Sequence, residues 1–74
     1  MTTRRTDIKA LRKKMIDEGF YTNTSLSAAS GVDRTLVGKI LSGKKQPPSE
    51  AMFRLAAALN MSDQEAVSIF FAKS

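Results

Sequence analysis

The 74-residue sequence contains neither cysteine nor histidine, and this absence excludes several classes of function. Without cysteine there is no disulfide framework and no thiol nucleophile. Without histidine there is no imidazole base, and the usual ligands of zinc are missing as well. We therefore predict that the protein is not an enzyme and that it has no catalytic residue, no metal site, no cofactor and no small-molecule substrate.

Long apolar runs are also absent. A membrane-spanning helix needs roughly 20 predominantly apolar residues, and no run here approaches that length. The basic N-terminal residues are not followed by the apolar stretch of a signal peptide. These features predict no membrane partner and a cytoplasmic location. A chain of this size lies near the lower limit for a single hydrophobic core, so we expect one small domain.

Positive charge is in excess and is unevenly distributed. Twelve Lys and Arg residues against seven Asp and Glu residues give a net charge of +5 and a sequence pI of about 10.0. Residues 1–45 contain ten basic and four acidic side chains, a balance of +6, and residues 46–74 contain two and three, a balance of −1. Such a pI is typical of nucleic-acid-binding domains, although a merely solvated basic surface is an alternative explanation.

The segment 23–42 is predicted to fold as two helices joined by a tight turn. Thr22 or Asn23 can cap a first helix that runs to about residue 30. Gly31 provides the conformational freedom that a sharp turn needs, and Asp33 can cap a second helix, 34–41. Tight turns between two such short helices favour a helix-turn-helix unit.

The second of these helices is predicted to have two different faces. On a helical wheel, Val37 and Ile40 share one side and suit a core. The opposite side has no carboxylate and consists of Thr35, Gly38, Lys39 and Ser42. A small, polar and basic face of this kind suits a helix that lies in the major groove of DNA between two rows of phosphates.

The rest of the chain is predicted to supply a flexible N-terminal arm, residues 1–5, and three further helices within a single domain, residues 6–74. Arg4 and Arg5 in the arm could reach a phosphate or a minor groove. Thr6 should cap the first helix and Ser49 the fourth, and Ser62 should open the last helix with a capping box. The expected buried side of the fourth helix consists of Met52, Phe53, Leu55, Ala56 and Leu59.

The pattern resembles the helix-turn-helix domains of the lambda-repressor and Cro type over about residues 7–68. The residues that carry the resemblance occur in the order Leu26, Ala29, Gly31-Val32, Val37, Ile40, Gly43-Lys44, Pro48-Ser49 and Leu59. This resemblance implies an all-α, five-helix fold with the helix-turn-helix at helices 2 and 3. It also implies a sequence-specific transcriptional regulator that binds double-stranded DNA, such as a Cro-like repressor of a temperate phage switch in the host bacterial cytoplasm.

The resemblance further implies which residues touch DNA. It places the base-reading residues at the start of helix 34–41 and further along it, at Arg34, Thr35 and Lys39. Asp33 falls in the same region, but capping the helix is its expected role. Contacts with DNA phosphates are expected from Asn23, Thr24, Ser42, Lys44 and Lys45.

Four apolar residues leave a second function open. Leu36 and Leu41 widen the apolar arc of helix 34–41 to about 140°, more than a packed helix usually needs. The set Val67, Phe70 and Phe71 either closes the core or forms a dimer seam or a groove for another protein, because Ile69 is expected to point away from part of that set. Leu36, Leu41, Ile69 and Phe71 either fill the core or form a protein-binding surface, with Leu36 mostly buried and Leu41 partly exposed. The second case resembles the modulator-of-repression, or antirepressor, proteins of temperate phages, whose partner is a phage repressor; a homodimer contact is the other option.

Overall fold

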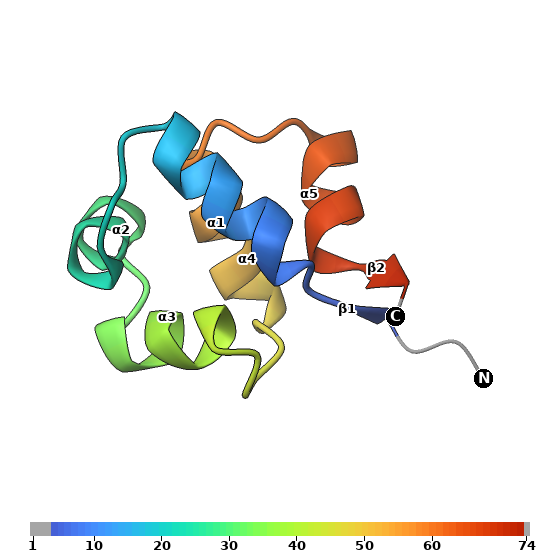
Figure 1. The fold of residues 1–74 in the computed structure, drawn as a ribbon, viewed down its shortest axis with the longest axis horizontal. Coiled ribbons are helices and arrows are strands. Elements are labelled where there is room, and N and C mark those ends of the chain that lie inside the picture. The colour runs from blue at the N-terminus through green and yellow to red at the C-terminus, as the bar shows by residue number, and fades with distance from the viewer. Residues whose placement is uncertain (1–3, 74) are drawn as a thin grey trace.

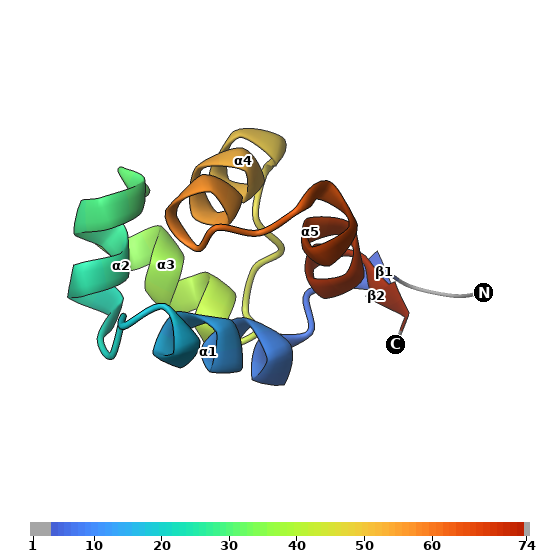
Figure 2. The same cartoon turned by 90° about the horizontal axis from the view of Figure 1, so that it is seen from above.

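The structure is a computed structural model that describes residues 4–73, and its body consists of five short helices. They are α1 (Ile8–Asp17), α2 (Asn23–Ser30), α3 (Arg34–Leu41), α4 (Ser49–Ala58) and α5 (Asp63–Phe70). Figure 1 shows α3 along the lower edge of the domain and α5 at the right, and Figure 2 shows α1 and α4 on opposite sides. This arrangement is the all-α, five-helix fold that the sequence predicts. No helix among the described residues is long and apolar enough to cross a membrane.

Side chains close the N-terminal ends of four helices in the described part of the chain. Thr22, Asp33 and Ser62 cap α2, α3 and α5, as predicted. The prediction that Thr6 caps α1 is wrong, because the Asp7 carboxylate accepts the hydrogen bond from the amide of Ala10 at 3.1 Å. Ser49 does not cap α4 either. It is the first helical residue, and Pro48 holds the cap position without a side-chain hydrogen bond.

The core is formed by side chains from all five helices. Its largest fully enclosed member is Phe70, with 0% of its surface exposed. Leu55 and Leu59 face inward from α4 as predicted, but Phe53 is 77% exposed, contrary to expectation. The buried apolar residues are Leu11, Met15, Leu26, Val32, Val37, Ile40, Leu41, Ala51, Leu55, Leu59, Ile69 and Phe70.

Two residues proposed for a protein-binding surface are part of this core. Leu41, predicted to be partly exposed, is only 2% exposed, because α1 packs against α3. Ile69 is 7% exposed rather than turned outward, because α5 packs against both α1 and α4. The expected arrangement of this segment is therefore confirmed for Phe70, which is buried, and wrong for the others: Ile69 is buried, whereas Val67 and Phe71 are exposed.

The ends of the described chain meet in a two-stranded antiparallel sheet that the sequence did not predict. Strand β1 (Arg4–Arg5) pairs with β2 (Ala72–Lys73), with Arg5 opposite Ala72. The two strands lie beside α5 at one end of the molecule (Figure 1). Arg4 and Arg5 were expected in a flexible arm, but their backbone is held in this sheet. Residues 1–3 of the predicted arm lie outside the described residues.

A polar cluster joins α1 to the start of α5. The Lys14 ammonium lies 3.2 Å from the Glu65 carboxylate and 3.9 Å from that of Glu18, which accepts a 2.8 Å hydrogen bond from the Asn60 amide. The hydrogen bond with Lys14, followed by that with the Ser62 amide, lowers the pKa of Glu65 below its ordinary value. These contacts tie α1 to the start of α5.

Candidate nucleic-acid interface

The turn between α2 and α3 is fixed by a glycine and a buried serine. Gly31 has a φ of 76°, in the left-handed region that glycine adopts without strain. A Cβ atom there would lie 2.9 Å from Nη1 of Arg54, so a larger residue would also displace that side chain. The Ser30 hydroxyl donates to the carbonyl of Leu26 at 2.7 Å and accepts from the amide of Val32 at 3.2 Å. The left-handed conformation of Gly31 and the two hydrogen bonds of Ser30 therefore fix the turn from which α3 starts.

The first turn of α3 is closed by Asp33. One carboxylate oxygen accepts hydrogen bonds from the amides of Thr35 at 3.0 Å and Leu36 at 3.3 Å. A negative charge at this end also suits the helix dipole. The capping role predicted for Asp33 is confirmed, and that oxygen is engaged inside the chain.

Helix α3 presents the two faces that the sequence predicts. Val37, Ile40 and Leu41 are buried against the domain. The three side chains predicted to read bases, Arg34, Thr35 and Lys39, are all exposed. The wheel argument therefore holds for the outward face, and the role of these three residues in reading bases stays a prediction.

The start of α2 lies beside the middle of α3. Asn23 and Thr24 occupy the first turn of α2 and are exposed. The side-chain nitrogen of Asn23 is 3.7 Å from the position that a Cβ atom would take on Gly38 of α3. The start of α2 and the middle of α3 therefore belong to one outward surface.

The loop after α3 folds back onto the end of that helix. Gly43 has a φ of 79°, and the amides of Lys44 and Lys45 both donate to the carbonyl of Lys39, at 2.9 and 3.3 Å. The Ser42 hydroxyl donates to the same carbonyl at 3.2 Å and would have to release this bond to donate to a phosphate. Lys44 and Lys45 are thereby held, exposed, at the C-terminal end of α3.

The basic side chains of this surface are not neutralised within the described part of the chain. The ion pairs found there join Lys14 to Glu18 and Glu65, and Arg54 to Glu50. Arg34, Lys39, Lys44 and Lys45 take part in none of them. Because none of the described carboxylates pairs with these cations, the surface suits a polyanion.

Arg12 belongs to this region but was missing from the predicted set. Its guanidinium donates to the carbonyl of Leu41 at 3.1 Å and so attaches α1 to the C-terminal end of α3. A cation near the C-terminus of a helix interacts favourably with the helix dipole. Here the cation belongs to α1 and lies at the C-terminal end of α3. Arg12 and Leu41 are 29 positions apart, so no local sequence pattern could have indicated this contact.

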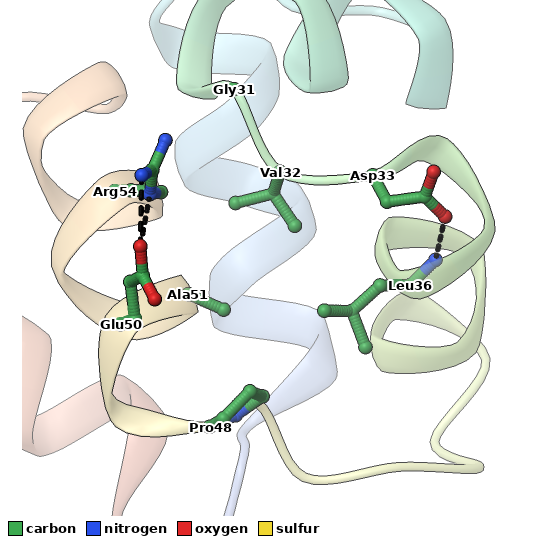
Figure 3. A pocket seen from close by; sticks show the side chains of 8 residues that line it. All are labelled: Gly31, Val32, Asp33, Leu36, Pro48, Glu50, Ala51 and Arg54. Atoms are coloured by element: carbon green, nitrogen blue, oxygen red, sulfur yellow. Dashed lines mark hydrogen bonds and ion pairs between the residues drawn. The ribbon is translucent and has the colours of Figure 1, made fainter.

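An open cleft of about 280 Å³ separates the turn from the start of α4. Figure 3 shows Leu36 and Val32 on one side of it and Ala51 and the Glu50–Arg54 ion pair on the other. The complete lining consists of Gly31, Val32, Asp33, Leu36, Pro48, Glu50, Ala51 and Arg54. Leu36 is half-buried at this cleft, so it is neither fully enclosed nor fully exposed.

Comparison with known proteins agrees with this geometry. The model of a helix-turn-helix family matches residues 8–65. Among solved structures, the chain is similar to the restriction-modification controller protein C.AhdI from Aeromonas hydrophila, with 27% sequence identity and a TM-score of 0.70. That similarity covers 80% of this chain and 88% of the other. No curated protein matches the sequence. The chain belongs to the helix-turn-helix family with the lambda-repressor-like fold, and it is a DNA-binding transcriptional regulator.

Proposed function

We propose that the protein recognises a specific operator sequence with α3 inserted in the major groove. The outward face of α3 supports this proposal most directly, because Arg34, Thr35 and Lys39 are exposed and lack ion-pair partners among the described residues. An α-helix fits the width of the major groove. Arg and Lys can donate to O6 and N7 of guanine, and the threonine methyl group can contact that of thymine.

Phosphate contacts beside the middle of α3 and after its C-terminal end would hold it in the groove. Asn23 lies beside Gly38 in the middle of α3, with Thr24 next to it in the chain, and Lys44 and Lys45 follow the C-terminal end. Contacts of this kind fix the register of a protein on the duplex without reading its sequence. Ser42 can also donate to a phosphate only if its hydroxyl gives up the hydrogen bond to the Lys39 carbonyl.

The narrower proposal is a repressor of the Cro type, which blocks transcription by occupying a promoter, as in a temperate phage switch in a bacterial cytoplasm. The similarity to a restriction-modification controller protein supports a regulatory role in a broader sense. A reporter assay on the chain's own promoter separates these roles. If the protein is a repressor, the amount of transcript should fall when the wild-type chain is supplied. It should not fall when the Lys39→Ala variant is supplied instead. A rise in transcript would contradict the blocking role.

Replacement of Lys39 with alanine should weaken binding to the operator by about 1 to 3 kcal/mol if this side chain contacts guanine, and should relax the preference at one base pair. Fluorescence anisotropy against the operator and its single-base variants measures both effects. Lys13→Ala, which removes an exposed cation from α1, is the control. Unchanged affinity and specificity would remove Lys39 from the interface.

The double replacement of Lys44 and Lys45 with alanine should act differently. It should weaken binding to all duplexes alike, because phosphates are the same in every sequence. The slope of log K against log salt should fall by about 0.9 for each phosphate that is no longer neutralised. A salt titration on operator and random duplexes checks this result, and a loss confined to the operator would contradict the phosphate assignment.

Replacement of Gly38 with alanine should affect the stability of the fold and the affinity for DNA in opposite directions. It should raise the free energy of unfolding by up to about 1 kcal/mol, because alanine favours helices and the new methyl group would meet Asn23 at an ordinary contact distance. DNA affinity should fall if the α3 backbone approaches the bases closely at this point. Urea unfolding and anisotropy measure the two quantities, and a variant that gains stability with unchanged affinity would exclude the close approach.

A second candidate function, binding to a partner repressor or to a second copy of the chain, is favoured by exposed apolar side chains on α5 and directly after it. Val67 and Phe71, four residues apart, are 54% and 40% exposed. Leu41 and Ile69 no longer support this function because they are buried, and Leu36 only lines the cleft. Sedimentation of the wild type and of Phe71→Ser, each alone and mixed with a phage repressor protein, tests the function. A complex that forms equally well with both chains would exclude Phe71 from it.

A further inference from the structure

We propose that strand β1 is a third element of the DNA interface and that Arg5 binds a backbone phosphate beside those held by Lys44 and Lys45. This inference rests on the proposed placement of α3 in the major groove, because that placement brings the loop after α3 to the DNA backbone. It adds to that interface a segment from the other end of the sequence.

Gln46 connects the strand to the lysine loop. Its side-chain oxygen accepts two hydrogen bonds from Thr6, one from the amide and one from the hydroxyl, each at 2.9 Å. Thr6 directly follows Arg5, and Gln46 directly follows Lys45. The bonds therefore place Arg5 next to the phosphate-binding loop, although 40 positions of sequence separate the two bonded residues.

The strand is also held from its other side. The amide of Asp7 donates to the carbonyl of Ile69 at 2.7 Å, and β1 pairs with β2 through Arg5 and Ala72. The Gln46 amide nitrogen donates to the carbonyl of Phe70 at 2.6 Å, so one side chain joins three segments. Because this backbone is ordered before DNA binds, a contact from Arg5 avoids much of the entropy loss of fixing a flexible arm.

The positive charge of this region favours a phosphate group as its partner. Arg5, Lys44 and Lys45 are all exposed, and none of them is paired with a carboxylate among the described residues. A guanidinium can donate two parallel hydrogen bonds to one phosphate, which an ammonium cannot do. Three neighbouring cations that have no ion-pair partner in residues 4–73 suit the regularly spaced phosphates of one DNA strand.

Salt-titrated binding of Arg5→Ala to the operator and to a random duplex tests the inference, with Lys13→Ala as the control of equal charge. We expect Arg5→Ala to weaken binding about two- to tenfold on both duplexes and to lower the salt slope by about 0.9. Lys13→Ala should keep the wild-type slope. An unchanged slope for Arg5→Ala, or an equal fall for Lys13→Ala, would overturn the inference.

Gln46→Ala tests the connection itself. It should reproduce the loss seen with Arg5→Ala, and the double variant should bind no more weakly than Arg5→Ala alone, because Gln46 acts by positioning Arg5. Additive losses would contradict this role. If the wild type binds no duplex, the proposed function and the inference fall together. If Lys39→Ala changes specificity and Arg5→Ala has no effect, only the inference fails.

Discussion

Replacement of Phe70 with alanine is expected to leave much of the protein unfolded near physiological temperature. Phe70 is the largest fully buried side chain, and it lies on α5, which packs against α1 and α4. Truncation of a buried phenylalanine typically costs about 3 to 5 kcal/mol, since it removes apolar contacts and leaves a cavity. A domain of this size has little more stability than that to lose.

The neighbouring Phe71 provides a matched control. It is the same type of residue on the next position, but 40% of it is exposed. Urea unfolding followed by circular dichroism should show a much smaller loss for Phe71→Ala than for Phe70→Ala. Similar losses for the two variants would contradict the side chain orientation described for the end of α5.

Replacement of Leu41 with alanine should also be strongly destabilising, by about 2 to 5 kcal/mol, because the side chain is enclosed between α3 and α1. Thermal unfolding measures this loss. DNA affinity, corrected for the folded fraction, should change little, because Leu41 lies on the inner face of α3. This outcome would identify Leu41 as a core residue rather than as part of a protein-binding surface.

Leu36, on the same helix, is the control for Leu41. It is half-buried at an open cleft, so Leu36→Ala should cost clearly less stability than Leu41→Ala. The core assignment of Leu41 would be contradicted if Leu41→Ala kept the wild-type melting temperature but no longer associated with a repressor. Leu41 would then belong to a protein-binding surface.

The helix-turn-helix itself could be predicted from the sequence because its signals are local. The expected bounds of α2 and α3 match the structure, and Thr22, Gly31 and Asp33 have the predicted capping and turn roles. Each role depends on residues within a few positions of one another. The assignment of a cap fails at two helices. At α1 the adjacent Asp7 replaces Thr6, whose hydroxyl binds Gln46, and at α4 Pro48 holds the cap position before Ser49.

The apolar residues at the edges of a helical stripe could not be assigned from the sequence. A wheel shows which residues share a face, but the packing of neighbouring helices decides how wide an arc is covered. Leu41 is covered because α1 crosses the end of α3, and Ile69 because α5 has two helical neighbours. On α4, Phe53 lies outside the covered arc that contains Ala51 and Leu55.

The contacts that join distant segments were also unpredictable. Gln46 reads as an ordinary polar loop residue, yet its bonds to Thr6 and Phe70 connect the loop after α3 with both ends of the described chain. The pairing of β1 with β2 involves only two residues in each strand, too few for a period-two pattern. The candidate DNA residues are all exposed, but their partners on DNA stay predictions.

The outward face of α3 has an evolutionary consequence. Within the described chain, the side chains of Arg34, Thr35 and Lys39 make no hydrogen bond or ion pair, while Asp33 and the buried residues of α3 hold the helix in place. Surface substitutions away from structural contacts usually change stability by less than about 0.5 kcal/mol. A lineage could therefore exchange these three residues and acquire a new operator preference without first acquiring compensating changes in the core.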